Sequence, residues 1–461
     1  MVQEMGEDKK FLANLEFGVA AFQDLGDKHV LSVSHNDGDG LTSSALVCKA
    51  MAFLKVPCMQ RIFDRSEAWD AYFAKQLAST KAINTIIITD LGSDEKQLCS
   101  FFEKHADIDL FILDHHKIPE SERVETYPGN VHSMNPTRFG LDGLREIAGS
   151  TLSYLFCERL APRVKKLAWL PVVGMAGDML KTAEKYVSYN KQVLEIAVEE
   201  GMAELHDGIA LLGGMADPTL QESVIRSILP FIDVAAGDKE RARAAITRAG
   251  LDPSENILSF SPRDASTLSG IFGRPVNGKT VLLAGKSGLL RHSFEFNFLA
   301  SIMGDENAAG ALALLDKKGP SPAEDRIYSD YIAKLVSYMA QITTRGGVDR
   351  EYFKFFEMGA SDTRQIVSDV ASFTSVNNLL GNEKMLVIAV KEHGERYKLS
   401  FRCSPEFVKA RGIGMGTVIE RLAKQFGGRG GGHDLAGGWN VPASDYKRFK
   451  DQIAIIDKII P

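Results

Sequence analysis

Apolar runs and longer amphipathic stretches alternate along the first part of the chain. Four runs predict strands: residues 29–34, 56–63, 83–89 and 108–113. Helices are expected between and after them, over residues 41–54, 71–79, 150–160 and 164–180. Apolar strands separated by helices are typical of a parallel sheet that is covered on both faces, so we expect an α/β fold here.

The pattern changes twice further along the chain. Residues 203–355 have a mostly helical pattern that is broken by turn signals such as Asp252-Pro253. Strand-like runs return at residues 385–391 and 396–401, and a helix is expected over 415–426. We therefore expect an α/β protein with three parts: an N-terminal parallel-sheet domain (1–202), a mainly helical insert (203–355) and a smaller C-terminal α/β domain (356–461).

Composition narrows the class of protein. The 461 residues are 44% hydrophobic and 25% charged, which is the balance of a folded globular protein. No apolar run reaches the roughly 18–20 residues that cross a bilayer, and the N-terminus does not resemble a secretory signal. The cysteines are scattered without a C-x-x-C pair, which argues against a disulfide framework or a cysteine zinc site. We expect a cytoplasmic protein. The five cysteines are Cys48, Cys58, Cys99, Cys157 and Cys403.

Charge is unevenly distributed. The net charge of -6 argues against indiscriminate binding to nucleic acid. Residues 361–461 nevertheless carry 15 Lys+Arg against 11 Asp+Glu, whereas the rest of the chain carries 39 against 49. A mildly basic C-terminal domain is typical of a protein that binds a polyanion. Ordinary variation of surface charge explains the difference in charge between the two parts of the chain equally well.

Acidic and imidazole side chains follow three of the predicted strands. In an open parallel sheet, such strand ends converge on one crevice. Four carboxylates crowded there would repel one another unless a divalent cation were bound. Carboxylate and imidazole without thiolate suit Mn²⁺ or Mg²⁺ and are compatible with Zn²⁺, and the histidines favour Mn²⁺. Asp90 alone is explained as a helix N-cap, and His35 alone as a packed histidine. Neither explanation accounts for the whole set of residues at the strand ends. The set comprises His35, Asp37 and Asp39, then Asp90, then Asp114, His115 and His116.

These motifs, with Asp178 further along, resemble the four motifs of the DHH phosphoesterase superfamily. Asp178 alone is explained equally well as a helix-terminus aspartate. The later Gly430-Gly431-Gly432-His433 resembles the signature of the DHH-associated domain. The long insert and the overall size resemble archaeal RecJ-like nucleases, which are related to a eukaryotic replicative-helicase subunit that has lost most metal ligands; this chain retains them. Residues 291–304 resemble a helical segment of these nucleases only loosely, so no substrate contact is assigned to them.

The resemblance implies a centre with two Mn²⁺ ions, or Mg²⁺ in their place, which activate a water and neutralise phosphoryl charge. It assigns Asp114 to orienting an imidazole and His116 to contacting the phosphate as a donor or acid. Which of His115 and His116 binds metal stays open. The implied ligands are His35, Asp37 and Asp90 for one ion, and Asp39, Asp90, His115 and Asp178 for the other.

The C-terminal motif is expected to hold the substrate. A glycine run lets a ligand approach the backbone, and a histidine at its end can donate to a phosphate or stack on a base. Arginines add charge-assisted contacts with phosphate. A glycine run alone would indicate only a flexible loop. The candidate substrate-binding residues are Arg402, Arg429, Gly430, Gly431, Gly432 and His433.

Three functions remain open at this point, of which the length of the chain favours the first, while the intact set of metal-ligand residues argues against a purely structural role. The first is a two-metal exonuclease that acts on single-stranded DNA or RNA, in DNA replication or repair. The second is a phosphodiesterase or phosphatase for small substrates: short oligonucleotides, cyclic dinucleotides or a nucleoside bisphosphate. The third is a replication scaffold that binds the GINS complex and the replicative helicase. Cleavage polarity, the preference between DNA and RNA, and the oligomeric state are not fixed by the sequence.

Overall fold

The computed structural model describes residues 6–63, 67–177, 182–344, 346–359, 363–392 and 395–461. The chain forms two compact units. The first comprises Met1–Ala210, Phe260–Ala265 and Asn277–Arg326, and the second comprises Leu211–Ser259, Ser266–Val276 and Ile327–Pro461. Among the described residues, no helix is long and apolar enough to cross a membrane.

The first unit is built on a five-stranded parallel sheet with the strand order β2-β1-β3-β4-β5. The four predicted strands are all present, and the predicted α/β fold is confirmed. A short fifth strand, which the hydrophobic pattern did not single out, extends the sheet beside β4. The bounds are β1 Val30–Ser34, β2 Cys58–Ile62, β3 Thr85–Thr89, β4 Asp109–Leu113 and β5 Val131–Ser133.

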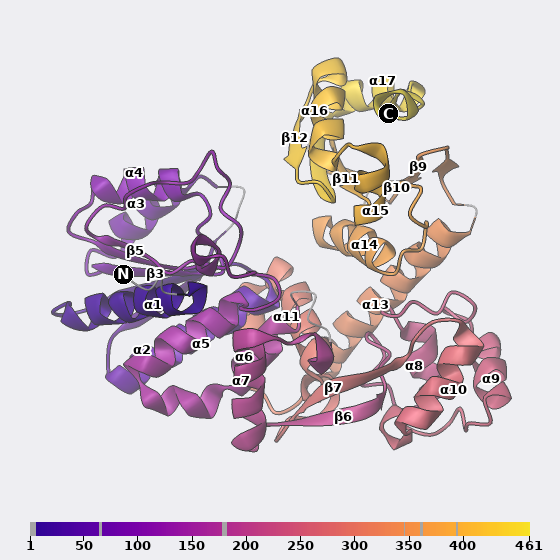
Figure 1. Ribbon diagram of the computed structural model, residues 1–461, viewed down its shortest axis with the longest axis horizontal. Helices are drawn as coiled ribbons and strands as arrows, with labels where there is room; N and C mark the ends of the chain where they lie inside the picture. Colours follow the sequence, from indigo (N-terminus) through magenta and orange to yellow (C-terminus); the bar gives the residue numbers. More distant parts are fainter. Residues whose placement is uncertain (1–5, 64–66, 178–181, 345, 360–362, 393–394) are drawn as a thin grey trace. The chain divides into compact units, whose positions relative to one another are not determined.

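Helices cover both faces of this sheet, as its continuous apolar strands require. On one face, α3 (Trp69–Ser79) and α4 (Glu95–Glu103) enclose a core in which Phe73 and Phe102 pack against Ile86. On the other face lie α1 (Glu7–Asp24), α2 (Gly38–Leu54) and α5 (Gly149–Leu160) (Figure 1). Helices α6 (Trp169–Met175) and α7 (Ser188–Glu199) follow α5.

Part of the predicted insert packs with the first unit. Strands β6 (Ala203–Ile209) and β7 (Asn277–Leu283) form an antiparallel pair. After β7, α11 (Ser293–Glu306) contacts α2 and α6, and α12 (Ala308–Leu315) contacts α11 and α2. The first unit therefore draws on segments that are far apart in the sequence.

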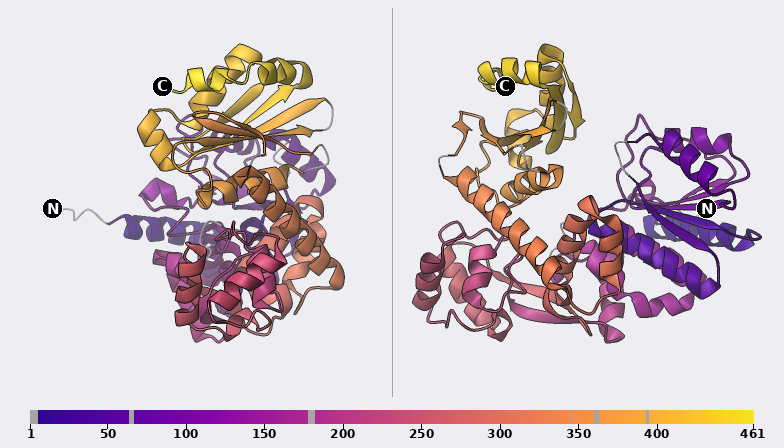
Figure 2. Two further views of the ribbon diagram at one scale, coloured as in Figure 1. Left: turned by 90° about the vertical axis from the view of Figure 1, so that its right-hand side faces the viewer. Right: turned by 180° about the vertical axis from the view of Figure 1, so that it is seen from behind.

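The second unit contains a six-stranded sheet with the order β12-β13-β11-β10-β9-β8. Helix α14 (Arg364–Val376) contacts β10 and β11, and the opposite face packs against α15 (Pro405–Arg411), α16 (Met415–Phe426), α17 (Ala443–Asp451) and α18 (Ile455–Ile459) (Figure 2). The bounds are β8 Val348–Asp349, β9 Phe353–Glu357, β10 Met385–Glu392, β11 Arg396–Arg402, β12 Arg429–Gly432 and β13 Ala436–Pro442.

Helices of the predicted insert complete the second unit: α8 (Leu220–Arg226), α9 (Lys239–Arg248) and most of α10 (Pro262–Phe272) and α13 (Pro322–Thr343). The side chain of Asn377, the residue after α14, holds the segment between α8 and α9. Its Oδ1 accepts a hydrogen bond from Phe231 N at 2.7 Å, and its Nδ2 donates to the carbonyl oxygen of Ile228 at 2.9 Å.

Candidate active site

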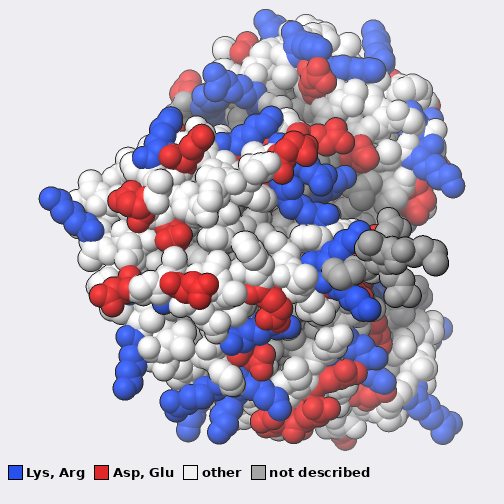
Figure 3. Space-filling model, turned by 60° about the vertical axis from the view of Figure 1, so that its left-hand side comes forward, with Lys and Arg blue, Asp and Glu red and all other residues white. Residues whose placement is uncertain are grey.

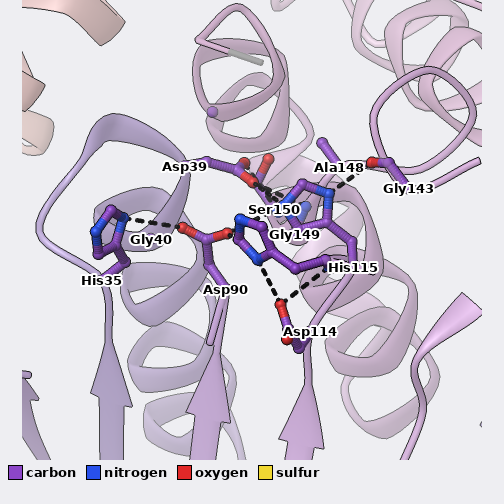
Figure 4. Close-up of polar contacts among 12 residues, drawn as sticks. His35, Asp39, Gly40, Asp90, Asp114, His115, Gly143, Ala148, Gly149 and Ser150 are labelled. Carbon is purple, nitrogen blue, oxygen red and sulfur yellow. Dashed lines mark hydrogen bonds and ion pairs between the residues drawn. The ribbon is translucent and has the colours of Figure 1, made fainter. Parts of the chain in front are cut away.

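The predicted acidic and imidazole residues meet at the carboxyl ends of three neighbouring strands. His35 follows β1, Asp90 follows β3, and Asp114, His115 and His116 follow β4 (Figure 4). Because these strands are parallel, their ends share one edge of the sheet, as the sequence predicted. Asp178, the remaining predicted ligand, lies outside the described residues.

His35 and Asp37 form one side of the cluster. The Nδ1 atom of His35 lies 2.7 Å from Asp37 Oδ2, while Asp37 Oδ1 caps α2 by accepting a hydrogen bond from Gly40 N at 3.0 Å. A side chain at Gly40 would lie 2.6 Å from the carbonyl oxygen of His35. This glycine therefore lets the loop turn tightly enough to bring both side chains to the sheet edge.

Asp90 lies at the centre of the cluster and is 2% exposed. Its φ of 56° is in the left-handed region, which a non-glycine residue adopts at a cost, often at a functional site. Its Oδ1 is 3.1 Å from His115 Nε2, and its Oδ2 is 3.7 Å from His35 Nδ1. Burial, followed by the neighbouring charge of Asp37, raises the pKa of Asp90 well above its usual value.

The donor set around Asp90 fits a divalent cation. Two groups each bring three ligand atoms within 4.8 Å of one another: His35, Asp37 and Asp90, and Asp90, His115 and His116. Among the described residues, Asp90 Oδ2 has no hydrogen-bond partner although it is buried. A bound cation would provide the partner that Asp90 Oδ2 lacks, and it would reduce the repulsion between the carboxylates.

The ring of His115 is fixed from both sides. Its Nδ1 lies 2.6 Å from the carbonyl oxygen of Gly143, and its Nε2 faces Asp90. A carbonyl can only accept a hydrogen bond, so Nδ1 carries a proton, and in the neutral ring the lone pair of Nε2 points into the cluster. This is the arrangement by which a backbone carbonyl orients a metal-ligating histidine.

His116 is held by Asp114. The buried carboxylate of Asp114 accepts from the backbone N–H of His116 at 3.2 Å, and the same oxygen lies 2.7 Å from the Nδ1 of that ring. Burial acts to raise the pKa of Asp114, but the charge and hydrogen bonds of His116 outweigh it and lower that pKa. The His116 side chain is 38% exposed, so a ligand can reach the ring.

Asp39 lies against the N-terminus of α5. Its Oδ2 accepts from Gly149 N at 2.8 Å and its Oδ1 accepts from Ser150 N at 3.0 Å (Figure 4). The helix dipole and these N–H groups stabilise a buried carboxylate here. Its Oδ2 is also 3.7 Å from His115 Nε2, but Asp39 belongs to neither three-ligand group. The sequence analysis did not predict this contact. The one feature of the sequence that indicates it is Gly149, the residue before the helix predicted over 150–160.

Helix α11 supports the loop after β1, a role that the sequence did not assign. Ser301 Oγ accepts a hydrogen bond from Gly38 N at 2.9 Å. The Nδ2 atom of Asn297 donates to the carbonyl oxygens of Val173 and Gly174, both at 2.9 Å. Helix α11 therefore contacts the segment that carries Asp37 and Asp39 through Ser301 and is held to α6 through Asn297.

In the second unit, the glycine run forms strand β12 of a tight hairpin with β13 (Figure 2). A side chain at Gly432 would overlap the backbone of Ala436, whereas one at Gly431 would meet nothing within 4 Å. Gly416 N, in the first turn of α16, donates to the carbonyl oxygen of His433 at 3.0 Å. The exposed His433 side chain is thus carried on a loop fixed to a helix N-terminus.

The two candidate arginines differ in environment. Arg429 is exposed at the start of β12. Arg402 is half-buried at the end of β11, where it pairs with Ala436 at the beginning of β13, so it and the His433 loop lie at the same end of the sheet. Burial lowers the pKa of Arg402, and Asp369 of α14 partly offsets this effect.

On the face of the molecule drawn in Figure 3, Lys and Arg are interspersed with Asp and Glu, so this face is of mixed charge.

Two family models match the chain. The model of the DHH family, N-terminal domain, matches residues 29–175, and that of the DHHA1 domain matches residues 353–459. Together the two matches cover more than half of the chain.

The chain is also similar to individual proteins. It is 25% identical over 445 residues to "Uncharacterized protein MJ0831" of Methanocaldococcus jannaschii, covering 94% of this chain and 93% of that protein. The crystal structure of CDC45 from Entamoeba histolytica matches with a TM-score of 0.69 at 12% identity, over 98% of this chain and 99% of that one. The structure of exonuclease RecJ bound to manganese matches with a TM-score of 0.53 at 17% identity, over 96% and 94%. These two structural matches establish a shared fold.

Proposed function

Because this chain belongs to the DHH family and carries a DHHA1 domain, we propose that it is a metal-dependent exonuclease that hydrolyses phosphodiester bonds of single-stranded DNA or RNA. The observation that carries the proposal is the position of Asp90, a buried carboxylate shared by two groups of ligand atoms and left with an unpartnered oxygen among the described residues. The fold shared with exonuclease RecJ over nearly the whole chain supports the choice of a nuclease.

We propose that the site holds two divalent cations, Mn²⁺ by preference and Mg²⁺ as the alternative. When bound, they would lower the pKa of a water and neutralise charge that develops on the phosphoryl oxygens. The structure of RecJ with manganese supports the choice of ion. The proposed ligands are His35, Asp37 and Asp90 for one ion, and Asp39, Asp90, His115 and Asp178 for the other.

His116 is proposed to contact the phosphate. Its Nδ1 is engaged by Asp114 at 2.7 Å, which leaves the Nε2 atom of this partly exposed side chain to hold a proton for the phosphoryl or leaving oxygen. The buried carboxylate of Asp114 stabilises the protonated imidazole and fixes its orientation. In this account Asp114 acts only through His116.

The C-terminal domain is proposed to hold the nucleic acid strand. Phosphate would be bound by the guanidinium groups and by the exposed backbone of the hairpin, and a base would stack on the histidine. We assign residues 1–202 to the catalytic domain, 203–355 to the connecting insert and 356–461 to the substrate-binding domain. The proposed substrate contacts are Arg402, Arg429, Gly430, Gly431, Gly432 and His433.

A replication scaffold that binds the GINS complex and the replicative helicase is the second candidate. The fold similarity to CDC45, with a TM-score of 0.69 over 98% of this chain, favours it over other non-enzymatic roles. The cluster around Asp90 favours catalysis, since a scaffold needs no buried carboxylate aimed at imidazole ligands.

The test is a length series of labelled substrates. Single-stranded DNA and RNA, labelled at the 5′ or the 3′ end, and matched di- and trinucleotides are incubated with Mn²⁺, Mg²⁺ or a chelator. Stepwise, metal-dependent shortening of the long strands supports the proposal and gives the polarity. Consumption of di- and trinucleotides alone would contradict it in favour of a small-substrate phosphodiesterase. Inertness toward all substrates, with co-elution of GINS, would favour the scaffold.

A further inference from the structure

Two cysteines of the first unit meet away from the active site. Cys48, in the third turn of α2, and Cys58, the first residue of β2, place their sulfur atoms 3.1 Å apart. Both are free thiols and both are partly exposed. The other three cysteines are buried. The spacing of ten residues gave no signal of this contact in the sequence, because a helix and a strand must pack before it forms.

The two thiols are chemically distinct. The hydrogen bond from Cys58 lowers the pKa of Cys48, against an opposing effect of burial, and Ser32 and Lys49 lower it further. The same hydrogen bond, together with burial, raises the pKa of Cys58. A thiolate is the nucleophile in thiol–disulfide exchange, and we assign Cys48, whose neighbour in the sequence is Lys49, as the attacking partner and Cys58 as the resolving one.

We propose that Cys48 and Cys58 form a redox-active dithiol that is reversibly oxidised to a disulfide by a low-molecular-weight disulfide such as oxidised glutathione. The Cys48 thiolate attacks one glutathione sulfur, forming a mixed disulfide and releasing one glutathione thiolate. Cys58 then loses its proton and attacks the Cys48 sulfur, which expels the second glutathione thiolate. Two protein thiols are oxidised and one glutathione disulfide is reduced to two thiols.

The geometry fits this chemistry better than metal binding. A disulfide requires the sulfurs to approach by about 1 Å more, which side-chain rotation at partly exposed positions can supply. A soft metal held by thiolates usually takes four ligands. Among the described residues, neither cysteine belongs to a group of three close ligand atoms.

The pair is separate from the candidate active site. Cys58 pairs with Val30 at the amino end of β1, whereas His35 follows Ser34 at the carboxyl end. Oxidation would close the short loop between α2 and β2 without touching the ligand cluster. We therefore expect the oxidised protein to keep its metal-dependent activity and to unfold at a higher temperature, because the unfolded chain is constrained.

The test equilibrates the full chain with mixtures of reduced and oxidised glutathione, blocks free thiols with N-ethylmaleimide and maps the peptides by mass spectrometry. The proposal predicts one intramolecular link between residues 48 and 58 that dithiothreitol reverses, and its absence in Cys48→Ser and Cys58→Ser. Cys99→Ser, a buried cysteine outside the pair, is the matched control and should retain the link. Blocked thiols at both positions under oxidising conditions would overturn the proposal, as would separate glutathione adducts on each.

Discussion

The Nδ1 atom of His115 lies 2.6 Å from the carbonyl oxygen of Gly143. This hydrogen bond links the loop after β4 to the segment before α5, and it selects the tautomer that turns Nε2 toward Asp90. Gly143 has no room for a side chain, because a Cβ there would overlap the carbonyl oxygen of His115. The orientation of the His115 ring thus depends on a glycine 28 residues further along the chain.

Gly143→Ala should displace the loop and weaken the metal centre. We expect divalent-cation affinity to fall by about 10–100-fold, the range for losing a partner that orients a metal-ligating histidine. Isothermal titration with Mn²⁺ measures this directly. Gly129→Ala is the matched control, since a Cβ at Gly129 meets nothing within 4 Å. Equal Mn²⁺ affinity in the two variants would argue against the role of Gly143.

Two neighbouring glycines of the C-terminal hairpin should respond differently to the same substitution. Gly432→Ala forces a Cβ against the backbone of Ala436 and should lower the free energy of unfolding by about 1–3 kcal/mol. Gly431→Ala meets no atom within 4 Å and should stay within about 0.5 kcal/mol of the original chain. Urea unfolding of both variants checks the difference. Similar values for the two would mean that the hairpin is not packed as described.

Burial of His292 should make the free energy of unfolding depend on pH in the acidic range. Its side chain is 6% exposed, and burial, followed by the charges of Arg291 and His206, lowers its pKa to about 4. The unfolded chain takes up this proton near pH 6.5 and the folded chain only near pH 4, so stability falls as pH drops through this window.

The free energy of unfolding changes by at most about 1.4 kcal/mol per pH unit because of His292. His292→Leu should make the fall in unfolding free energy shallower by up to that amount between pH 6.5 and 4. Urea unfolding in the presence of a chelator, at several pH values, compares the two chains. If the unfolding free energy of both chains falls equally with pH, His292 does not cause the fall.

The sequence predicted the sheet and the meeting of the acidic and imidazole residues because both depend on short-range patterns. Apolar strands ending in Asp or His are visible in a window of ten residues, and parallel topology then brings their ends together. The described structure has Asp37 and Asp114 beside the histidines they orient, within two positions in the sequence.

The parts that the sequence did not reveal are long-range backbone contacts. Gly149 N reaches Asp39 across 110 positions, and Ser301 accepts from Gly38 N across 263. Neither leaves a periodic signal, because a backbone donor has the same chemistry in every residue. The contact between Cys48 and Cys58 was missed for a related reason, since it needs α2 packed on the sheet.

Substitution of Asp90 tests whether the cluster at the sheet edge is a catalytic metal centre. The rate at which a labelled single strand is shortened is measured against Mn²⁺ concentration for the original chain, for Asp90→Ala and for Asp70→Ala, an exposed aspartate of α3 that serves as the matched control. A loss of at least about 100-fold is expected in Asp90→Ala, because a bound metal ion contributes several kcal/mol to catalysis, with folding retained by circular dichroism and an unchanged rate in Asp70→Ala. Metal-dependent shortening at a comparable rate by folded Asp90→Ala would contradict a catalytic centre built around this carboxylate.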